Sequence, residues 1–511
     1  MSRGGGAAAL ITAFLIVAGT LAWFFPPVST DEVVATARSW EMLKGRGSHY
    51  TLYNDVFHPS VYAWRDLSPD NVRVVHNLWL IPFLALGGRG HWAARCSSIV
   101  AGALALLFLW LFLRRRLTGL GAEGIALLAV HPLFWLAAVL VRPEMPLLAA
   151  VAGILWLIDA LPSAWEKKSP LLGLLMGLSV GFHPNAAPLL AGVCVHWHLS
   201  EPAQRTVARW SAWAVGVAVA GLSLVAVVDL KSFAAGMRIF GDAFYRVPFV
   251  EDWRPWRWLG RPASFLFAGD SFYLREAHRG PWVGSLRVAG AIFFGAAILG
   301  VARAWRSSPT VRSLASAWAV WWVTAAALVS RREALYGALA LPLLYPLVVL
   351  GLFTVQKKWR GAVIAGLATL QLAAGAGAVF SYRSHYLSEG EIQRAFRRLV
   401  PDEKAKILGP NRMWFLAPDR TRDLGALVFS RWFTGRSDLW GECLASWRPE
   451  VVVLDPFVKK NLLGPGDSAE SLARSVPARV ALRGFIDTGS GGDGLWEVLS
   501  LQWPSQGRNP S

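Results

Sequence analysis

Residues 7–32 read AAALITAFLIVAGTLAWFFPPVSTDE, and this stretch decides the class of the protein. Its apolar part, residues 7–25, is long enough to cross a bilayer as a helix, and the two prolines that follow end that helix. Two adjacent carboxylates, Asp31 and Glu32, then lie where hydrocarbon gives way to water. Carboxylates close to hydrocarbon are costly, and they usually have a functional task there.

The segment after these carboxylates has the pattern of an amphipathic helix. Val33, Ala37 and Trp40 recur at helical spacing, which is typical of a helix that lies along a membrane surface. A second interpretation stays open, because acidic residues also favour the first turn of any helix. On that interpretation Asp31 and Glu32 form only a polar helix start.

The composition of the 511-residue chain predicts a polytopic membrane protein. Hydrophobic residues make up 54% of it and charged residues 16%, and the mean hydropathy is +0.40. The formal charge of +18 comes from Lys and Arg scattered between apolar segments, which favours lipid headgroups as partners and excludes nucleic acid. The three cysteines lack the spacing of a zinc site or a disulfide framework.

Apolar runs of spanning type recur along the first three quarters of the chain, and we expect about eleven transmembrane helices. The count is uncertain by about two, because two short runs meet at His183-Pro184-Asn185. The expected spans are 7–25, 97–113, 121–140, 146–161, 171–182, 186–199, 211–229, 284–302, 313–329, 334–354 and 361–380.

The basic short loops fall on one side of this arrangement, and the positive-inside rule makes that side cytoplasmic. We therefore expect a multi-pass protein of the cytoplasmic (inner) membrane. The opposite, outer side receives every residue after about 382 and four polar groups. These groups are Asp31-Glu32, Arg142-Pro143-Glu144, His183 and Arg331-Arg332.

The chain divides into a membrane domain, 1–382, and a C-terminal domain, 383–511. The membrane domain has a first outer loop, 26–96, in which His76 to Leu86 forms a second surface-lying apolar segment. Its outer loop 230–283 holds an aromatic and basic cluster. The tryptophans of that cluster, Trp253, Trp256 and Trp258, are either interfacial anchors or a substrate loop that stacks on a sugar.

The C-terminal domain is polar, and its pattern predicts a small α/β fold outside the membrane. Ser388 and Glu391 have the spacing of a capping box before a helix that runs to about Leu399. We expect strands at 406–408, 451–454, 479–485 and 495–501, with a helix at 424–433. The sequence has no Gly-rich nucleotide-binding loop.

The four outer polar groups combine acids with cations, and each also has a structural interpretation. Arg142 and Glu144 can simply pair with each other, His183 can cap a helix, and the two arginines at 331 and 332 can reach toward headgroups. Acids and cations on one membrane face also suit glycosyl transfer from a lipid-linked sugar phosphate. A base takes the proton of the acceptor hydroxyl, and cations stabilise the charge that builds on the leaving phosphate.

Several of these segments, in this order and spacing, resemble the GT-C membrane glycosyltransferases. The resemblance is strongest to the branch of protein O-mannosyltransferases and lipid A aminoarabinose transferases. It covers about residues 1–380. The matching segments are Asp31-Glu32 with the helix that follows, Gly87 to Leu113, Arg142 to Leu148, Gly177 to Pro184, and Arg332 to Pro342.

The resemblance implies a GT-C fold and an inverting transfer from a polyprenyl-phosphate-linked sugar to an acceptor hydroxyl on a glycan, lipid or protein. Asp31 would be the catalytic base, and Glu32 and Glu144 would orient the acceptor or the base. The donor phosphate would be held by Arg142, His183, Arg331 and Arg332. Some relatives use a divalent cation, which Asp31 and Glu144 could share.

The chain departs from the family pattern at two of these positions. Glu144 stands where the family usually has Asp, and His183 stands where Lys is common. A histidine would be only partly charged at neutral pH, so these changes bear on how the phosphate is held. Two other functions stay open: a flippase or transporter of lipid-linked sugars, and a non-catalytic relative that only binds them.

Overall fold

The structure is a computed structural model of the chain. It describes residues 3–24, 30–45, 73–117, 121–161, 165–183, 185–200, 206–227, 254, 256, 259–260, 262, 281–329, 335–383, 388–417, 420–424, 444, 447–459, 478–487 and 495–504. Contacts divide the chain into two compact units. The first comprises Met1–Trp23, Leu67–Leu80 and Ala94–Phe380, and the second comprises Phe24–Asp66, Ile81–Ala93 and Ser381–Ser511.

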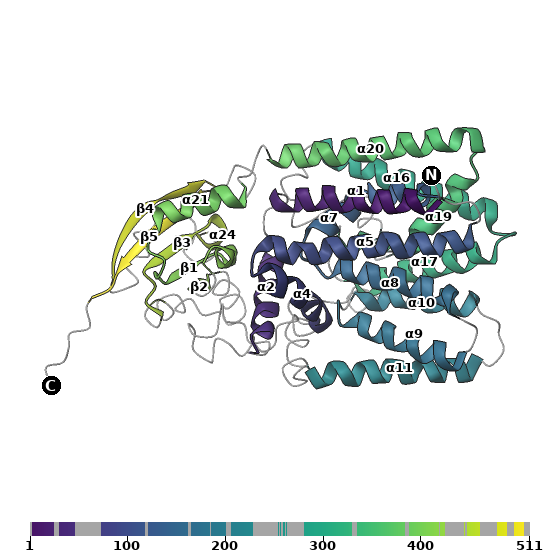
Figure 1. Cartoon of the computed structure of the whole chain (residues 1–511), viewed down its shortest axis with the longest axis horizontal. Coiled ribbons are helices and arrows are strands. Elements are labelled where there is room, and N and C mark those ends of the chain that lie inside the picture. The colour runs from purple at the N-terminus through teal and green to yellow at the C-terminus, as the bar shows by residue number, and fades with distance from the viewer. Residues whose placement is uncertain are drawn as a thin grey trace. The chain divides into compact units, whose positions relative to one another are not determined.

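Each of the eleven predicted apolar runs contains a helix, and the long helices lie side by side with nearly parallel axes (Figure 1). They are α1 (Arg3–Phe24), α5 (His91–Arg116), α6 (Glu123–Ala129), α7 (Pro132–Val139), α8 (Glu144–Ala160), α9 (Trp165–Val180), α10 (Ala186–Ser200), α11 (Thr206–Val227), α16 (Pro281–Ala304), α17 (Pro309–Leu328), α18 (Leu335–Ala338), α19 (Leu341–Phe353) and α20 (Lys357–Arg383).

Within the described ranges, three helices are long and apolar enough to cross a membrane: 4–23 in α1, α5, and 206–225 in α11. A fourth candidate is the pair α7 and α8, which is bent by 115° at the break between them. The break at His183 lies between α9 and α10, as the sequence predicted. The full number of spans stays a prediction.

Small residues allow neighbouring helices of the first unit to approach closely. A Cβ atom at Gly173 in α9 would lie 2.0 Å from the carbonyl oxygen of Trp213 in α11. One at Gly216 in α11 would lie 2.0 Å from the carbonyl oxygen of Pro170. In lipid, the hydrophobic effect does not drive helices together, so close backbone packing at small residues contributes to their association.

The C-terminal part of the second unit is a mixed sheet with a helix along one face (Figure 1). Helix α21 (Glu389–Leu399) precedes strands β1 (Ile407–Gly409), β2 (Thr421–Asp423), β3 (Val451–Leu454), β4 (Arg479–Asp487) and β5 (Leu495–Gln502). The strand order is β2-β1-β3-β5-β4. The first three strands are parallel, and β5 runs antiparallel to both of its neighbours. The helix predicted from Ser388 to about Leu399 and all four predicted strands are therefore present.

The two faces of this sheet bury different apolar clusters. Ile392 and Phe396 of α21 pack on one face with Met413 and Trp496, and Leu454 and Leu499 belong to the cluster on the other. The structure adds β2, which the sequence did not predict. Of the helix expected at 424–433, only residue 424 lies within the described part of the chain.

The two predicted surface helices of the first loop are also present as helices. They are α2 (Thr30–Leu43) and α4 (Val74–Gly87). Helix α2 belongs to the second unit, together with the C-terminal sheet. The structure therefore groups the segment bearing Asp31 and Glu32 with residues 381–511, although the sequence had suggested a membrane domain that ends at about 382.

The capping box at the start of α21 gives a test of local stability. Ser388 Oγ accepts a hydrogen bond from the backbone N–H of Glu391 at 3.4 Å, and Ser388 N–H donates to Glu391 Oε2 at 2.7 Å. Loss of such a cap costs about 1 kcal/mol, so we expect Ser388→Ala to speed amide exchange in α21 about fivefold. Hydrogen exchange with mass spectrometry measures this, with Ser388→Thr as the control. Unchanged exchange in Ser388→Ala would contradict the assignment of the cap.

Candidate active site

A break in the first unit places two charged side chains in apolar surroundings. Helix α7 ends at Val139, the backbone is extended at Leu140, and α8 starts at Glu144 after Pro143. Glu144 therefore lies in the first turn of α8, where the positive end of the helix dipole favours a carboxylate. The segment expected to interrupt two spans is thus a sharp turn that presents Arg142 and Glu144 together.

Arg142 and Glu144 form a buried, two-pronged ion pair. Arg142 Nη2 donates to Glu144 Oε1 at 2.8 Å, and Nε donates to Oε2 at 3.2 Å. The side chains are only 4% and 0% exposed, respectively. The pairing that the sequence left open therefore occurs. A buried pair of this kind is retained only when both charges are well satisfied, because the cost of taking them out of water is high.

The pair is not isolated, because other polar residues of the first unit lie close to it. His183 and Arg73 are near enough to act electrostatically on Glu144, and Arg73, Arg142 and His76 act on His183. The His183 ring also lies 5.6 Å from that of Tyr336 in α18. We call Arg73, His76, Arg142, Glu144 and His183 the cationic cluster.

Arg73 and His76 are the members of this cluster that the sequence analysis missed. They flank the start of α4, where the N–H of Val75 donates to the carbonyl oxygen of Gly181 at 3.0 Å. This bond ties α4 to the turn that carries His183. A Cβ atom at Gly181 would lie 2.5 Å from Val75 Cγ2, so glycine is what permits this close approach. An arginine directly ahead of an apolar segment in an outer loop was the signal available in the sequence.

Burial disfavours the charged form of His183, for which the sequence suggested partial charge. It lies in the turn between α9 and α10, and burial lowers the pKa of its imidazole to about 3. The nearby Arg73 lowers that pKa further, whereas Glu144 acts in the opposite direction. His183 Nδ1 accepts a hydrogen bond from the N–H of Asn185 at 2.9 Å. The proton of the neutral ring is therefore on Nε2, which can donate to an anion.

Asp31 and Glu32 lie in the first turn of α2, in the second unit. Glu32 is buried and Asp31 is half-buried. The apolar face of α2 packs on Trp414 through Val33 and Ala37. Both carboxylates therefore start a helix, as the sequence predicted, and this helix belongs to a different compact unit from Glu144.

Several predicted site residues fall outside the described residues. These are Arg331 and Arg332, and Trp253 and Trp258 of the possible substrate loop. Trp256 is described and is 71% exposed. Nearby, the backbone carbonyl of Leu259 accepts a hydrogen bond from Trp322 Nε1 of α17 at 2.8 Å, so this part of the loop is held against the helices of the first unit.

The described residues contain no group of three or more His, Cys, Asp or Glu placed to hold a metal ion. The cationic cluster contains one carboxylate, which is already engaged by Arg142. Its remaining members are two arginines and two histidines, a set better suited to an anion than to a cation. What this cluster can do chemically is to hold a phosphate or another oxyanion.

The buried pair makes a prediction about stability. We expect Arg142→Met to lower the free energy of unfolding by about 3–5 kcal/mol, because it leaves the Glu144 carboxylate buried without its partner. The double variant Arg142→Met/Glu144→Met should be less destabilised than Arg142→Met alone. Thermal unfolding of the full chain in detergent measures this difference.

The pair Arg116–Asp159 offers a matched control, because its side chains are 30% and 7% exposed. We expect Arg116→Met to cost clearly less than Arg142→Met, because water reaches the Arg116–Asp159 pair on its arginine side. Equal losses for Arg142→Met and Arg116→Met would contradict the account of Arg142 and Glu144 as a buried pair.

The comparisons with known proteins agree with this architecture. Residues 74–228, which include four of the five members of the cationic cluster, match the family model described as dolichyl-phosphate-mannose-protein mannosyltransferase. No curated protein matches the chain.

Among solved structures, the chain is similar to ArnT from Cupriavidus metallidurans. The apo form matches with a TM-score of 0.56 at 14% identity, and the form bound to undecaprenyl phosphate matches with 0.55 at 13%. Each match covers 98% of both chains. The chain therefore shares the fold of ArnT over almost its whole length. Both comparisons agree with the resemblance to the GT-C membrane glycosyltransferases that the sequence suggested.

Proposed function

We propose that the protein is an inverting glycosyltransferase that moves a sugar from a polyprenyl-phosphate-linked donor to an acceptor hydroxyl. The observation that carries the proposal is the cationic cluster, four of whose five members are buried and lie within the segment that matches the mannosyltransferase family model. The likeness of the fold to a protein that binds undecaprenyl phosphate supports the same class of donor.

In this proposal the cluster holds the donor phosphate. Arg142 and Arg73 supply permanent positive charge, and His183 Nε2 supplies a neutral hydrogen-bond donor. Arg331 and Arg332, which lie outside the described residues, would add to this group. Negative charge builds on the phosphate oxygens as the bond to the sugar breaks, so fixed donors stabilise the transition state more than the ground state.

Glu144 is a poor candidate for the base, because both of its oxygens accept hydrogen bonds from Arg142. Its role in the proposal is to fix the orientation of Arg142. The base is then Asp31, with Glu32 beside it to orient the acceptor. Asp31 takes the proton of the acceptor hydroxyl, whose oxygen bonds to the anomeric carbon as the bond to the phosphate oxygen breaks. The products are the glycoside and free polyprenyl phosphate.

The side of the membrane on which the reaction occurs can also be inferred. We infer that the reaction occurs at the outer face of the cytoplasmic membrane, with the C-terminal domain extracytoplasmic. The basic short loops mark the other side of the membrane as cytoplasmic by the positive-inside rule. The acceptor is a glycan, lipid or protein hydroxyl.

The direct test uses the full chain purified in detergent, a panel of polyprenyl-phosphate sugars and an acceptor-containing membrane extract. We expect the native chain to release free polyprenyl phosphate. Asp31→Asn should slow this release at least 100-fold while donor binding persists, since a general base contributes roughly 10²–10⁴-fold.

Asp402→Asn is the matched control, because Asp402 is an exposed aspartate of the same unit. It should turn over as the native chain does. Full turnover in Asp31→Asn would exclude Asp31 as the base. Sugar-lipid movement across vesicles without release of polyprenyl phosphate would favour a transporter, and donor binding without turnover or transport would favour a non-catalytic binder.

A second prediction concerns the phosphate site. Arg73→Gln should weaken binding of polyprenyl phosphate about 10- to 100-fold, because a hydrogen bond to a charged group contributes about 1.5–3 kcal/mol. Arg303→Gln, at the end of α16, should bind as the native chain does. Fluorescence-detected binding to protein in detergent measures both constants. Equal affinity in Arg73→Gln and the native chain would exclude Arg73 from the phosphate site.

A third prediction concerns pH. The lowered pKa of His183, about 3, keeps its ring neutral through the range from pH 6 to 8. The sugar donor is a phosphate diester whose charge is constant over the same range, so the pH dependence of donor affinity should be the same in the native chain and in His183→Gln. A rise in affinity from pH 8 to pH 6 that disappears in His183→Gln would show that His183 titrates there.

A further inference from the structure

Three segments that are far apart in the sequence meet within the second unit. The 3-10 helix η5 (Asn411–Phe415) follows directly on β1 of the C-terminal sheet. Its Trp414 packs against α2, and the ring of its Phe415 lies 6.0 Å from that of His91 at the start of α5. One turn of the C-terminal domain thus contacts both the helix that bears Asp31 and the end of the first outer loop.

Neighbouring side chains of η5 point into different apolar clusters. Met413 is fully buried in the cluster between the sheet and α21. Trp414, which is only 2% exposed, packs with Val33 and Ala37 of α2, both of which are fully buried. Because the two side chains are consecutive, η5 connects the core of the sheet to α2 through a single peptide unit.

The turn itself is tightly held. Thr421 Oγ1 of β2 donates to the carbonyl oxygen of Ala417 at 2.7 Å and shares this proton with that of Met413 at 3.3 Å. The N–H of Met413 donates to the carbonyl oxygen of Pro410 at 2.9 Å. The Trp414 side chain is therefore presented to α2 from a rigid support.

The contact lies close to the proposed base. Val33 is two residues after Asp31 and one after Glu32, and Ala37 is one helical turn further on. A helix is stiff over so short a distance, so a shift or rotation of α2 at Val33 moves both carboxylates with it. Misplacement of a reacting group by about 1 Å can cost 10²-fold in rate.

We propose that Trp414 is a positioning residue, through which the C-terminal domain sets the place of α2 and therefore of Asp31. The catalytic part of this inference rests on the proposed function, whereas the mechanical part does not. The C-terminal domain is then a part of the catalytic apparatus.

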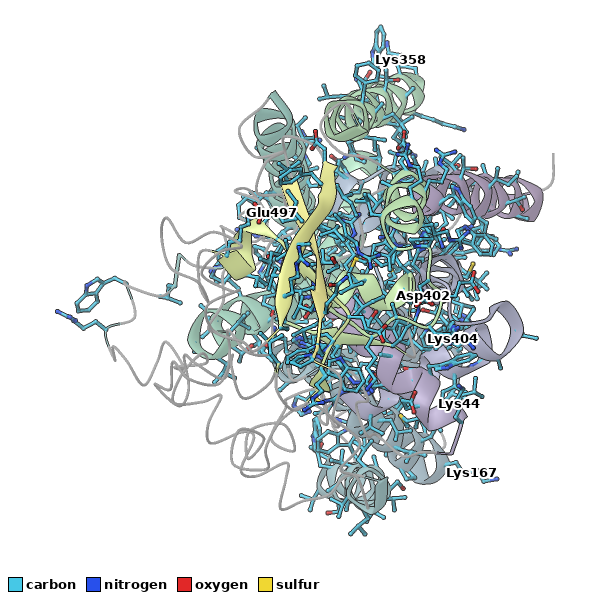
Figure 2. All side chains as sticks on the ribbon, turned by 90° about the vertical axis from the view of Figure 1, so that its left-hand side faces the viewer. Lys44, Lys167, Lys358, Asp402, Lys404 and Glu497 are labelled. Atoms are coloured by element: carbon cyan, nitrogen blue, oxygen red, sulfur yellow. The ribbon has the colours of Figure 1, made fainter. Side chains whose placement is uncertain are left out.

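The mechanical part is tested with two spin labels in the full chain, after replacement of Cys96, Cys194 and Cys443 by serine. The labels replace Lys44, at the end of α2, and Lys404, ahead of β1. Both are exposed residues of the second unit that can be found in Figure 2. Pulsed electron paramagnetic resonance should give a narrow distance distribution in the otherwise native chain. Trp414→Ala should broaden or shift it, and Trp414→Phe should largely restore it.

Leu499→Ala is the matched control. It removes a fully buried side chain from the other face of the same sheet, away from α2. The distance distribution should then stay as narrow as in the native chain. If Trp414→Ala leaves the distribution unchanged while the chain remains folded, or if Leu499→Ala broadens it equally, the inference is wrong.

The catalytic part is tested by steady-state release of polyprenyl phosphate. Trp414→Ala should lower kcat about 100-fold and change KM for the donor less than threefold, because the cationic cluster lies in the first unit. Trp414→Phe should recover most of kcat, and Leu499→Ala should stay within threefold of the native chain. Equal losses of kcat in Trp414→Ala and Leu499→Ala would show that Trp414 only stabilises the fold.

The two readouts separate the possible failures. If the native chain releases no polyprenyl phosphate from any donor, the proposed function fails, and the spin-label distances still decide whether Trp414 fixes α2. If the spin-label distances change in Trp414→Ala while kcat does not, Trp414 holds α2 but the position of α2 does not limit the reaction. That result would overturn the catalytic part of the inference.

Discussion

The buried ion pair between Arg142 and Glu144 is the constraint on which the cationic cluster depends. Two charges with almost no exposure are tolerated only because each satisfies the other through two hydrogen bonds. The break between α7 and α8 brings them together, since it places the carboxylate in the first turn of a helix and the guanidinium directly ahead of it. With Arg142 fixed in this way, the nearby Arg73 and His183 complete a group of hydrogen-bond donors. Such a group is preorganised for an anion, and preorganisation is what makes electrostatic stabilisation effective.

The proposed chemistry distributes its tasks between the two compact units. The side chains proposed to hold the phosphate belong to the unit of apolar helices, and the proposed base belongs to the unit that contains the C-terminal sheet. A lipid-linked donor explains why the first task falls to the apolar helices, because its lipid chain stays in the hydrocarbon. The proposed role of the C-terminal domain is to hold α2 in place through the contact of Trp414 with Val33 and Ala37.

Much of this architecture could be predicted from the sequence, because the relevant signals are local. Apolar length predicted the helices, the Ser388 and Glu391 spacing predicted the cap of α21, and His183-Pro184-Asn185 predicted the break after α9. Strand β2 was missed because its three residues, Thr421 to Asp423, are too short to show a period. The place of Arg73 beside His183 and of Trp414 against α2 could not be predicted, since both depend on contacts between segments far apart in the chain. The lowered pKa of His183 likewise follows from burial, which no local pattern reveals.

A structure of the full chain with bound polyprenyl phosphate would decide whether the cationic cluster holds the phosphate of a polyprenyl-linked donor. An electron cryo-microscopy map of the complex in a lipid nanodisc would locate the phosphate. We expect the phosphate oxygens to lie within hydrogen-bond distance of Arg142, Arg73 or His183 Nε2. A phosphate bound at full occupancy away from all three side chains would exclude the cationic cluster as the phosphate site.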